Sequence, residues 1–265
     1  LAGSEAQKAE ILPGIAEGQT RLSLAYLEAP GQLDPSIVAM RARNDGDNFI
    51  ISGHKIAALY ANVADHLLVS ARMFGQVGDH QGISLFVVPA NAKGLAIDAY
   101  RTHDDGWAAD LLSAAGRGPA GAGVGSAGSA LGTIEDALDA GAAALCAEAV
   151  GAMWSLHDMT LDYIKVRKQF GAAIGSFQAI QHRMVNMYMK CQLAQSMALA
   201  GMAAPDLSDS GAGARRRAVS AAKVQVGRAA RQVGEDAIQL HGGIAMTDEY
   251  AAGHYFKRLT MIRLM

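Results

Sequence analysis

The runs Tyr163-Ile-Lys-Val-Arg-Lys-Gln-Phe-Gly171 and Ala172-Ala-Ile-Gly-Ser-Phe-Gln-Ala-Ile-Gln-His182 are consecutive, and they decide the architecture of the chain. The first has the pattern of the end of a long amphipathic helix, and the glycines at 171 and 175 favour a helix stop. Ser176 is of the residue type that caps a following helix. The sequence therefore predicts two long helices joined by a short glycine-bearing turn.

Arg167 lies one turn before this break. A guanidinium beside the free N–H groups of a helix start can hold an anionic phosphate group. The alternative is a helical hairpin with a solvated Arg-Lys pair, and the spacing alone fits both. A second run, Ile238-Gln-Leu-His-Gly-Gly243 followed by Thr247-Asp-Glu-Tyr250, also reads as a helix that ends in glycine.

Together the two runs resemble the C-terminal signatures of the flavin-dependent acyl-CoA dehydrogenases. The resemblance implies FAD between a β middle domain and a C-terminal helical bundle, with the nucleotide end of FAD held by a neighbouring subunit. Arg167 would bind the pyrophosphate, Phe170 would pack nearby and Gln178 would meet the adenine end. Gln239, Gly242 and Gly243 would wrap the ribityl–pyrophosphate portion, where glycine allows close backbone approach. The structural alternatives are a helix stop at the two glycines and a core position for Phe170.

Composition sets the class of protein. The chain has 265 residues, of which 51% are hydrophobic and 18% charged, as in a globular protein of one large domain or two. A net charge of −2 gives no general attraction to nucleic acid or an anionic membrane. Cys146 and Cys191 fall in helical patterns, which argues against a disulfide framework and fits a reducing cytoplasm. We expect no membrane span and no secretory signal, and the opening Leu-Ala-Gly indicates a piece of a longer protein.

The expected fold class is α+β. Residues 1–19 would be the tail of an otherwise absent N-terminal helical domain, with a short helix stopped by Pro13-Gly14. Residues 20–112 show six or more short β-rich runs, which predict an antiparallel barrel or sandwich. Residues 133–265 predict a four-helix bundle. Its helices are expected near 133–169, 176–203, 213–241 and 247–265, with Met184, Met187 and Met189 filling a core or a subunit contact.

The segment 113–132 consists almost entirely of small residues. It contains the pattern G-x-G-x-x-G twice, but no strand is predicted before it, as a dinucleotide fingerprint requires. We therefore expect a flexible interdomain linker rather than a phosphate loop. Relatives usually have a strand here.

The flavin-facing half of the family site departs from the pattern. In Tyr26-Leu-Glu-Ala-Pro-Gly31, Leu27 stands where the family offers the threonine of Thr-Glu-Pro. Ala57-Ala58-Leu59 stands where relatives place Trp-Ile-Thr against the isoalloxazine ring. Apolar side chains cannot supply the hydrogen bonds that tune flavin N5.

The catalytic base remains unassigned. In the family a carboxylate removes the α-proton of an acyl-CoA while the β-hydride goes to flavin N5. The counterpart of the usual glutamate falls just past Met265, and the other place for it, at the start of the long helix, is Gly141 with Ala142 after it. Asp139 matches an acidic residue that would contact the CoA portion, whereas Glu148 is rotated away on the same helix. No His, Cys, Asp or Glu cluster has metal-ligand spacing.

The resemblance therefore implies an FAD-dependent acyl-CoA dehydrogenase, or a subunit of one, that oxidises an acyl-CoA thioester and passes electrons to an electron-transfer flavoprotein. The chain keeps the residues that reach a neighbour's FAD and lacks those that face its own. This predicts a heterotetramer with a homologous subunit and a bulky CoA thioester, as in steroid and lipid breakdown. The alternatives are a homodimer or homotetramer, a non-catalytic partner subunit, or a related acyl-CoA oxidase-type, nitroalkane-type or hydroxylase-type flavoenzyme.

Overall fold

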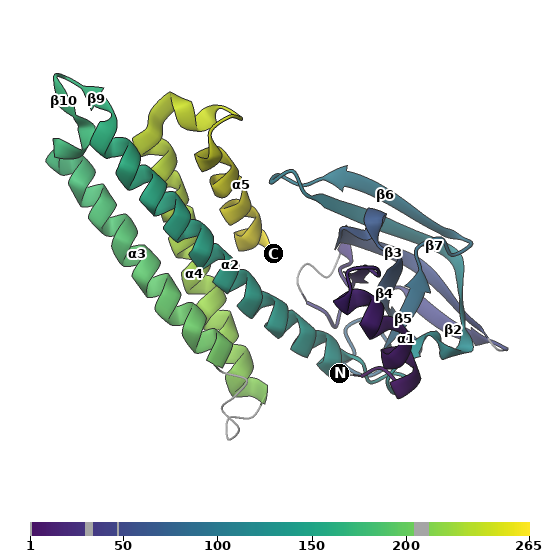
Figure 1. The fold of residues 1–265 in the computed structure, drawn as a ribbon. Coiled ribbons are helices and arrows are strands. Elements are labelled where there is room, and N and C mark those ends of the chain that lie inside the picture. The colour runs from purple at the N-terminus through teal and green to yellow at the C-terminus, as the bar shows by residue number, and fades with distance from the viewer. Residues whose placement is uncertain (1, 30–33, 47, 204–211) are drawn as a thin grey trace. The chain divides into compact units, whose positions relative to one another are not determined.

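The computed structural model describes residues 2–29, 34–46, 48–203 and 212–265 (Figure 1). The chain divides into two compact units, Leu1–Ala137 and Leu138–Met265. The first unit contains a β-sheet and the second is helical. The predicted α+β class, with a β middle domain followed by a helical bundle, is confirmed.

The first unit begins with α1 (Glu5–Ala16). Ser4 and Gln7 form a capping box, in which each side chain bonds the other residue's backbone N–H. The predicted stop at Pro13-Gly14 is wrong, because Pro13 lies inside the helix. The backbone N–H of Glu17 still donates to the Pro13 carbonyl at 3.0 Å, so only the bond that proline itself cannot make is lost.

Eight strands form one sheet. They are β1 (Leu22–Ala25), β2 (Arg41–Asp45), β3 (Asn48–Leu59), β4 (His66–Arg72), β5 (Ile83–Pro89), β6 (Leu95–Arg101), β7 (Trp107–Pro119) and β8 (Gly123–Val124). The order across the sheet is β6-β7-β3-β2-β4-β5-β8, with β1 also on β4. Pairing is antiparallel, except that β1 and β2 run parallel to β4. Leu67, Phe86 and Leu111 are among the side chains of its core.

The prediction of a flexible linker over 113–132 is wrong. β7 continues to Pro119 on β3, η3 (Ala120–Ala122) and β8 follow, and the first bundle helix begins at Leu131. The Ser113 hydroxyl donates to the Ile51 carbonyl at 2.7 Å and accepts the Gly116 N–H at 2.9 Å. A Cβ at Gly116 would lie 2.6 Å from that hydroxyl oxygen, so a larger residue there would displace the Ser113 hydroxyl. Backbone hydrogen bonds to β3 hold this end of β7 in place, and such bonds need no large side chains.

The second unit contains most of α2 (Leu131–Val166) together with α3 (Gln178–Ala203), α4 (Ala212–His241) and α5 (Ala251–Leu264). The four predicted helices are therefore confirmed. α2 ends at Val166 because β9 (Lys168–Gln169) and β10 (Ala172–Ala173) form a hairpin. Ser176 does not cap α3: it lies in η4 (Ile174–Ser176), and its hydroxyl donates to the Ala173 carbonyl at 2.7 Å.

The bundle core contains sulfur-bearing side chains beside small and aliphatic ones. Met153, Met187 and Cys191 are fully buried, and Met184 is nearly so. Met189 is instead exposed, so only part of the methionine stripe belongs to the core. Both cysteines are free and buried, and burial raises the pKa of the Cys191 thiol to about 12.

The expectation that no segment could span a membrane needs one correction. α2 is long and apolar enough to do so, judged by length and composition alone. The core helix of a protein that never enters a membrane meets the same two criteria. Met153, Leu156 and Ile164 of α2 do contribute to the bundle core.

Candidate functional site at one end of the helical bundle

Both quoted runs meet at one end of the bundle. The β9–β10 hairpin after α2, the start of α3 and η6 (Gly242–Met246) after α4 lie at this end (Figure 1). The Tyr163 ring lies 4.6 Å from the His241 ring, centroid to centroid, and the His241 ring lies 5.0 Å from that of Tyr250. An aromatic cluster therefore joins two stretches that are far apart in the sequence.

Arg167 follows the last residue of α2. Its N–H donates to the Tyr163 carbonyl at 2.9 Å, and its carbonyl accepts the Ile174 N–H at 2.8 Å, which closes the base of the hairpin. The side chain is exposed, and within the described part of the chain no acceptor is found for its guanidinium. Lys165, two residues earlier, pairs with Asp162 at 3.4 Å. Arg167 is thus a rigidly mounted cation that is available to an anion.

Phe170 forms the tip of the hairpin. Its φ is +52° and that of Gly171 is +79°, the left-handed pair that a tight two-residue hairpin turn requires. The Phe170 side chain is 93% exposed, and its ring centroid lies 6.3 Å from that of Phe177. The alternative of a core residue is therefore excluded within this chain.

The other four predicted FAD contacts are also at this end. Gln178 opens α3 and Gln239 lies in the last turn of α4, and both side chains are exposed. Gly242 has φ +65°, and a Cβ at Gly242 or Gly243 would meet no atom within 4 Å. Packing inside this chain therefore does not explain the second glycine, and the surface above both is open to a ligand.

Asp139 does not join this group. It lies on α2 about 40 Å along the helix from Arg167, at 1.5 Å per residue. One carboxylate oxygen is 3.7 Å from Arg215 Nε and 3.9 Å from Arg216 Nε, both on α4. Glu148 accepts a bidentate pair of hydrogen bonds from Arg258 of α5, at 2.6 and 2.9 Å. Both carboxylates thus connect helices of the bundle.

The counterpart of the Thr-Glu-Pro segment is partly described, since Pro30 and Gly31 lie outside the described residues. The Leu27 carbonyl accepts the Ile56 N–H at 2.9 Å. Sequence reasoning missed the buried pair beside it, in which Lys55 Nζ donates to Glu28 Oε1 at 2.6 Å. Burial lowers the pKa of Lys55 to about 8, against the opposing effect of Glu28.

The counterpart of Trp-Ile-Thr is equally well fixed. Ala57 has φ +52°, and its N–H donates to Asp110 Oδ1 at 3.1 Å. The Tyr100 hydroxyl donates to the same oxygen at 3.1 Å. The Ala57-Ala58-Leu59 segment thus has a defined backbone, although it lacks the aromatic ring and the hydroxyl of Trp-Ile-Thr.

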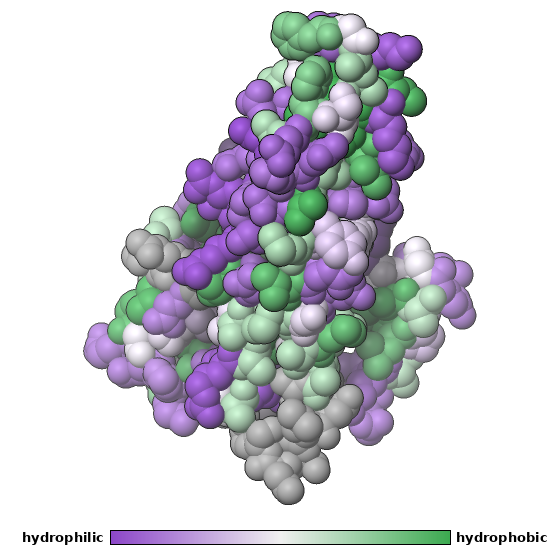
Figure 2. Space-filling model, turned by 90° about the vertical axis from the view of Figure 1, so that its left-hand side faces the viewer, coloured by the Kyte–Doolittle hydropathy of each residue, from purple (hydrophilic) through white to green (hydrophobic). Residues whose placement is uncertain are grey.

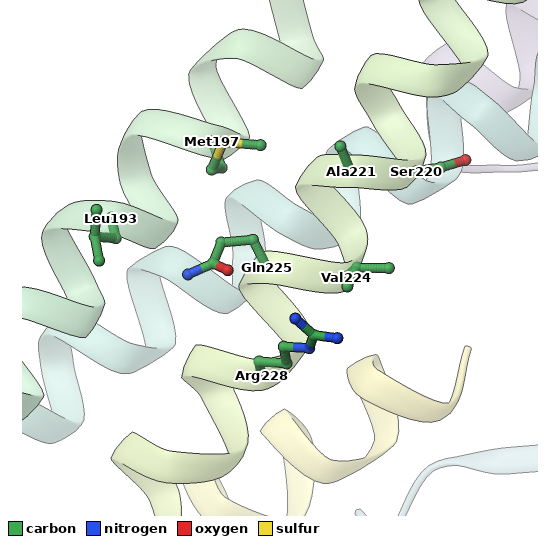
Figure 3. A pocket seen from close by; sticks show the side chains of 7 residues that line it. All are labelled: Leu193, Met197, Ser220, Ala221, Val224, Gln225 and Arg228. Carbon is green, nitrogen blue, oxygen red and sulfur yellow. The ribbon is translucent and has the colours of Figure 1, made fainter.

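A shallow groove of about 620 Å³ lies between α3 and α4, away from these residues (Figure 3). Gln225 reaches from α4 toward α3, and Arg228 lies at one end of the groove. The groove is lined by Leu193, Met197, Ser220, Ala221, Val224, Gln225 and Arg228. Leu193 lies about 20 Å along α3 from Gln178.

Figure 2 shows hydrophobic patches among hydrophilic residues on the side of the molecule that it presents. Within the described ranges, no group of three His, Cys, Asp or Glu side chains could hold a metal ion.

Comparisons with known proteins identify the family. The family described as "Acyl-CoA dehydrogenase, C-terminal domain" matches residues 131–265, half of the chain, and "Acyl-CoA dehydrogenase, middle domain" matches residues 23–109. "Probable acyl-CoA dehydrogenase YngJ" of Bacillus subtilis is 32% identical over 253 residues, which cover 94% of this chain and 65% of that protein. "Acyl-CoA dehydrogenase IpdE2" of Mycolicibacterium smegmatis is 41% identical over 120 residues, 45% of this chain and 36% of that protein. A solved structure described as an "FAD-dependent dehydrogenase" is 25% identical with a TM-score of 0.92, covering 100% of this chain and 70% of that one.

The chain spans about two thirds of the length of the YngJ protein and of the solved dehydrogenase. The middle-domain match falls on the β-sheet, and the C-terminal-domain match falls on the helical bundle. The chain belongs to the acyl-CoA dehydrogenase family.

Proposed function

We propose that this chain is part of an FAD-dependent acyl-CoA dehydrogenase and that the end of its bundle holds the pyrophosphate and adenine portion of FAD. The observation that carries the proposal is the gathering of Arg167, Gln178, Gln239 and the Gly242–Gly243 pair at that one end. The exposed guanidinium of Arg167 would be a charge-assisted donor to a pyrophosphate. The open space above both glycines lets a ligand approach the backbone.

FAD, when bound, supplies the acceptor for the hydride that leaves an acyl-CoA thioester. The residues of this chain would bind and orient it. Arg167 would neutralise pyrophosphate charge, Phe170 would cover an apolar part of the cofactor, and Gln178 and Gln239 would offer amide groups. No catalytic base is assigned to the chain.

Asp139 remains our proposed contact to the CoA portion. Its carboxylate lies beside two arginines and can accept a hydrogen bond, so it would suit an amide N–H or a hydroxyl of CoA. The two buried free thiols fit a reducing compartment, and we place the enzyme in the cytoplasm.

We further propose that the enzyme is a heterotetramer of this chain and a homologous subunit. The support is a difference between two sets of positions: the chain has all the residues that we propose for the nucleotide end of FAD, whereas Leu27, Ala57 and Leu59 lack the groups that would face a flavin. The partner would hold the isoalloxazine ring and supply the carboxylate. A bulky CoA thioester of the steroid type and an electron-transfer flavoprotein as acceptor complete this proposal. The homotetramer and the non-catalytic partner subunit are the rivals.

Expression of the chain alone and together with its native partners tests the proposal. We expect little flavin and no acyl-CoA oxidation from the chain alone, and fewer flavins than chains in the active complex. One FAD per chain with full turnover and no second polypeptide would rule out the heteromer. A flavin-free active complex would contradict the cofactor proposal itself.

A further inference from the structure

His241 lies under the glycine pair, at the point where three segments meet. It is 3% exposed and stands between Tyr163 of α2 and Tyr250, the residue before α5. Its Nδ1 lies 2.8 Å from the Ala237 carbonyl oxygen. A carbonyl can only accept, so Nδ1 carries the proton and Nε2 does not.

Nε2 is buried, and no hydrogen-bond partner is found for it in the part of the chain that the structure describes. Protonation would create a second N–H in a place without an acceptor, and it would bury a charge. Burial accordingly lowers the pKa of His241 below its ordinary value of 6.5, opposed only by the bond to Ala237. The imidazole is thus neutral at neutral pH.

The contacts of His241 connect the two halves of the proposed FAD site. On one side, Gly242 follows it directly, with a left-handed backbone at φ +65°. On the other side its ring packs on Tyr163, whose carbonyl accepts the Arg167 N–H at 2.9 Å. The His241 ring is therefore a direct contact between the segment that carries the glycine pair and the helix end that carries Arg167.

Arg167 and the Gly242–Gly243 turn together are called the FAD clamp here. We infer that His241 is a positioning residue of this clamp: its neutral imidazole keeps the Gly242–Gly243 turn beside the Arg167 end of α2. This inference rests on the proposed function. An apolar ring would also hold the two halves together, but only histidine makes the clamp depend on pH.

The groups around the imidazole decide the sign of that dependence. The titratable side chains that face it are the phenols of Tyr163 from α2 and Tyr250 from the turn before α5. The described contacts of the ring include no carboxylate that would stabilise an imidazolium. A protonated His241 would attract the pyrophosphate of FAD. However, a charged imidazole needs solvent, and this buried ring reaches solvent only by losing its contacts with Tyr163 and Tyr250. Acidification therefore loosens the clamp.

The test is the dissociation constant of FAD in the complete enzyme, measured by titration while circular dichroism shows it folded. On acidification below 6.5, we expect affinity in the native enzyme to fall by up to about tenfold per pH unit, the limit for one linked proton. His241→Phe keeps the ring contacts and cannot titrate, so it should bind FAD like the native protein at neutral pH and lose this acid dependence. His182→Phe, at an exposed position of α3, is the matched control and should keep it.

An FAD affinity that stays constant or rises on acidification overturns the inference, and so does an unchanged acid dependence in His241→Phe. His241→Ala, which removes the ring contacts, should weaken FAD binding at neutral pH as well. If it does not fold, the comparison between native protein and His241→Phe decides alone. A native complex that binds no FAD at any pH contradicts the proposed function, which distinguishes that failure from failure of the inference.

Discussion

At the scale of single residues, Ala57 shows how a strained backbone is held in place. A left-handed alanine costs roughly 1–2 kcal/mol relative to an ordinary conformation. Asp110 offsets that cost, because one carboxylate oxygen accepts both the Ala57 N–H and the Tyr100 hydroxyl at 3.1 Å. The other oxygen lies 3.7 Å from His54 Nε2. Three strands, β3, β6 and β7, thereby converge on one side chain.

The account predicts that Asp110→Ala lowers the free energy of unfolding by about 1–3 kcal/mol. In an Ala57→Gly background the loss should be smaller, because glycine adopts a positive φ without a steric penalty. Asp98→Ala, directly opposite on β6, removes the same charge from a more exposed position and serves as the control. Urea denaturation of the four variants measures the effect. Equal losses in the alanine and glycine backgrounds would show that Asp110 does not hold Ala57.

The family resemblance grouped Arg167, Gln178, Gln239 and the glycine pair in one proposed site, and the local signals of helix ends placed them near helix termini. The same signals could not show that Phe170 would stand exposed at a left-handed turn, since phenylalanine is rarely found there. Asp110 and Glu28 were missed for another reason. Their partners, Ala57 and Lys55, lie on β3, whereas Asp110 lies on β7 and Glu28 in the loop after β1. Contacts between segments this far apart in the sequence cannot be read from either segment alone.

At the scale of elements, a buried ion pair connects β3 and β4 to the loop after β1. Lys55 Nζ donates to Glu28 at 2.6 Å, to the Ser70 hydroxyl at 2.9 Å and to the Tyr26 carbonyl at 3.2 Å. Glu28 also accepts the N–H groups of Ala39 and Met40, at 2.8 and 3.1 Å. The pair therefore ties together the chain before and after the residues that the structure leaves undescribed.

Removing one member of this pair should be costly. Lys55→Met leaves a buried carboxylate without its cation, for which we expect a loss of about 3–5 kcal/mol in unfolding free energy. Glu28→Gln added to it should recover part of the loss, because the amide oxygen still accepts from the backbone. Lys8→Met breaks an exposed pair with Glu5 in α1 and should change stability little. Thermal denaturation separates the cases, and a Lys55→Met protein as stable as the native one would refute a structural role for the pair.

The strand β7 shows why some elements escape sequence reasoning altogether. Residues after Ser113 carry almost no side chain, so neither alternation nor β-propensity marks them. Their pairing partner β3 supplies the order instead, through backbone bonds and the Ser113 hydroxyl. The long helices of the second unit, by contrast, carry their own apolar period and were predictable to within a few residues at most ends.

At the scale of the whole molecule, the outer faces of α3 and α4 bear on assembly. Leu193 and Val224 line the groove and are each 53% exposed. An enzyme whose FAD site is shared between chains must bury apolar surface between them. We therefore expect this groove to lie in a subunit contact.

A charge placed in that groove should weaken assembly. Leu193→Glu buries a carboxylate against apolar side chains in the complex, and we expect the enzyme to dissociate into smaller species. Leu199→Glu makes the same change at a leucine of α3 that is 58% exposed and outside the groove, and it should leave assembly intact. Sedimentation velocity reports the outcome. Native-size complexes in both variants would exclude the groove as a subunit contact.

The most direct test of the central claim is the flavin content of the purified complex after Arg167→Ala. Loss of a charge-assisted contact to the pyrophosphate should cost about 1.5–3 kcal/mol, a roughly ten- to hundredfold weaker affinity for FAD. Lys165→Ala removes a charge two residues away that already pairs with Asp162, and it should keep native flavin content. Flavin is released from each complex and quantified by absorbance per chain. The account predicts depletion in Arg167→Ala alone, and equal flavin in all three proteins would contradict it.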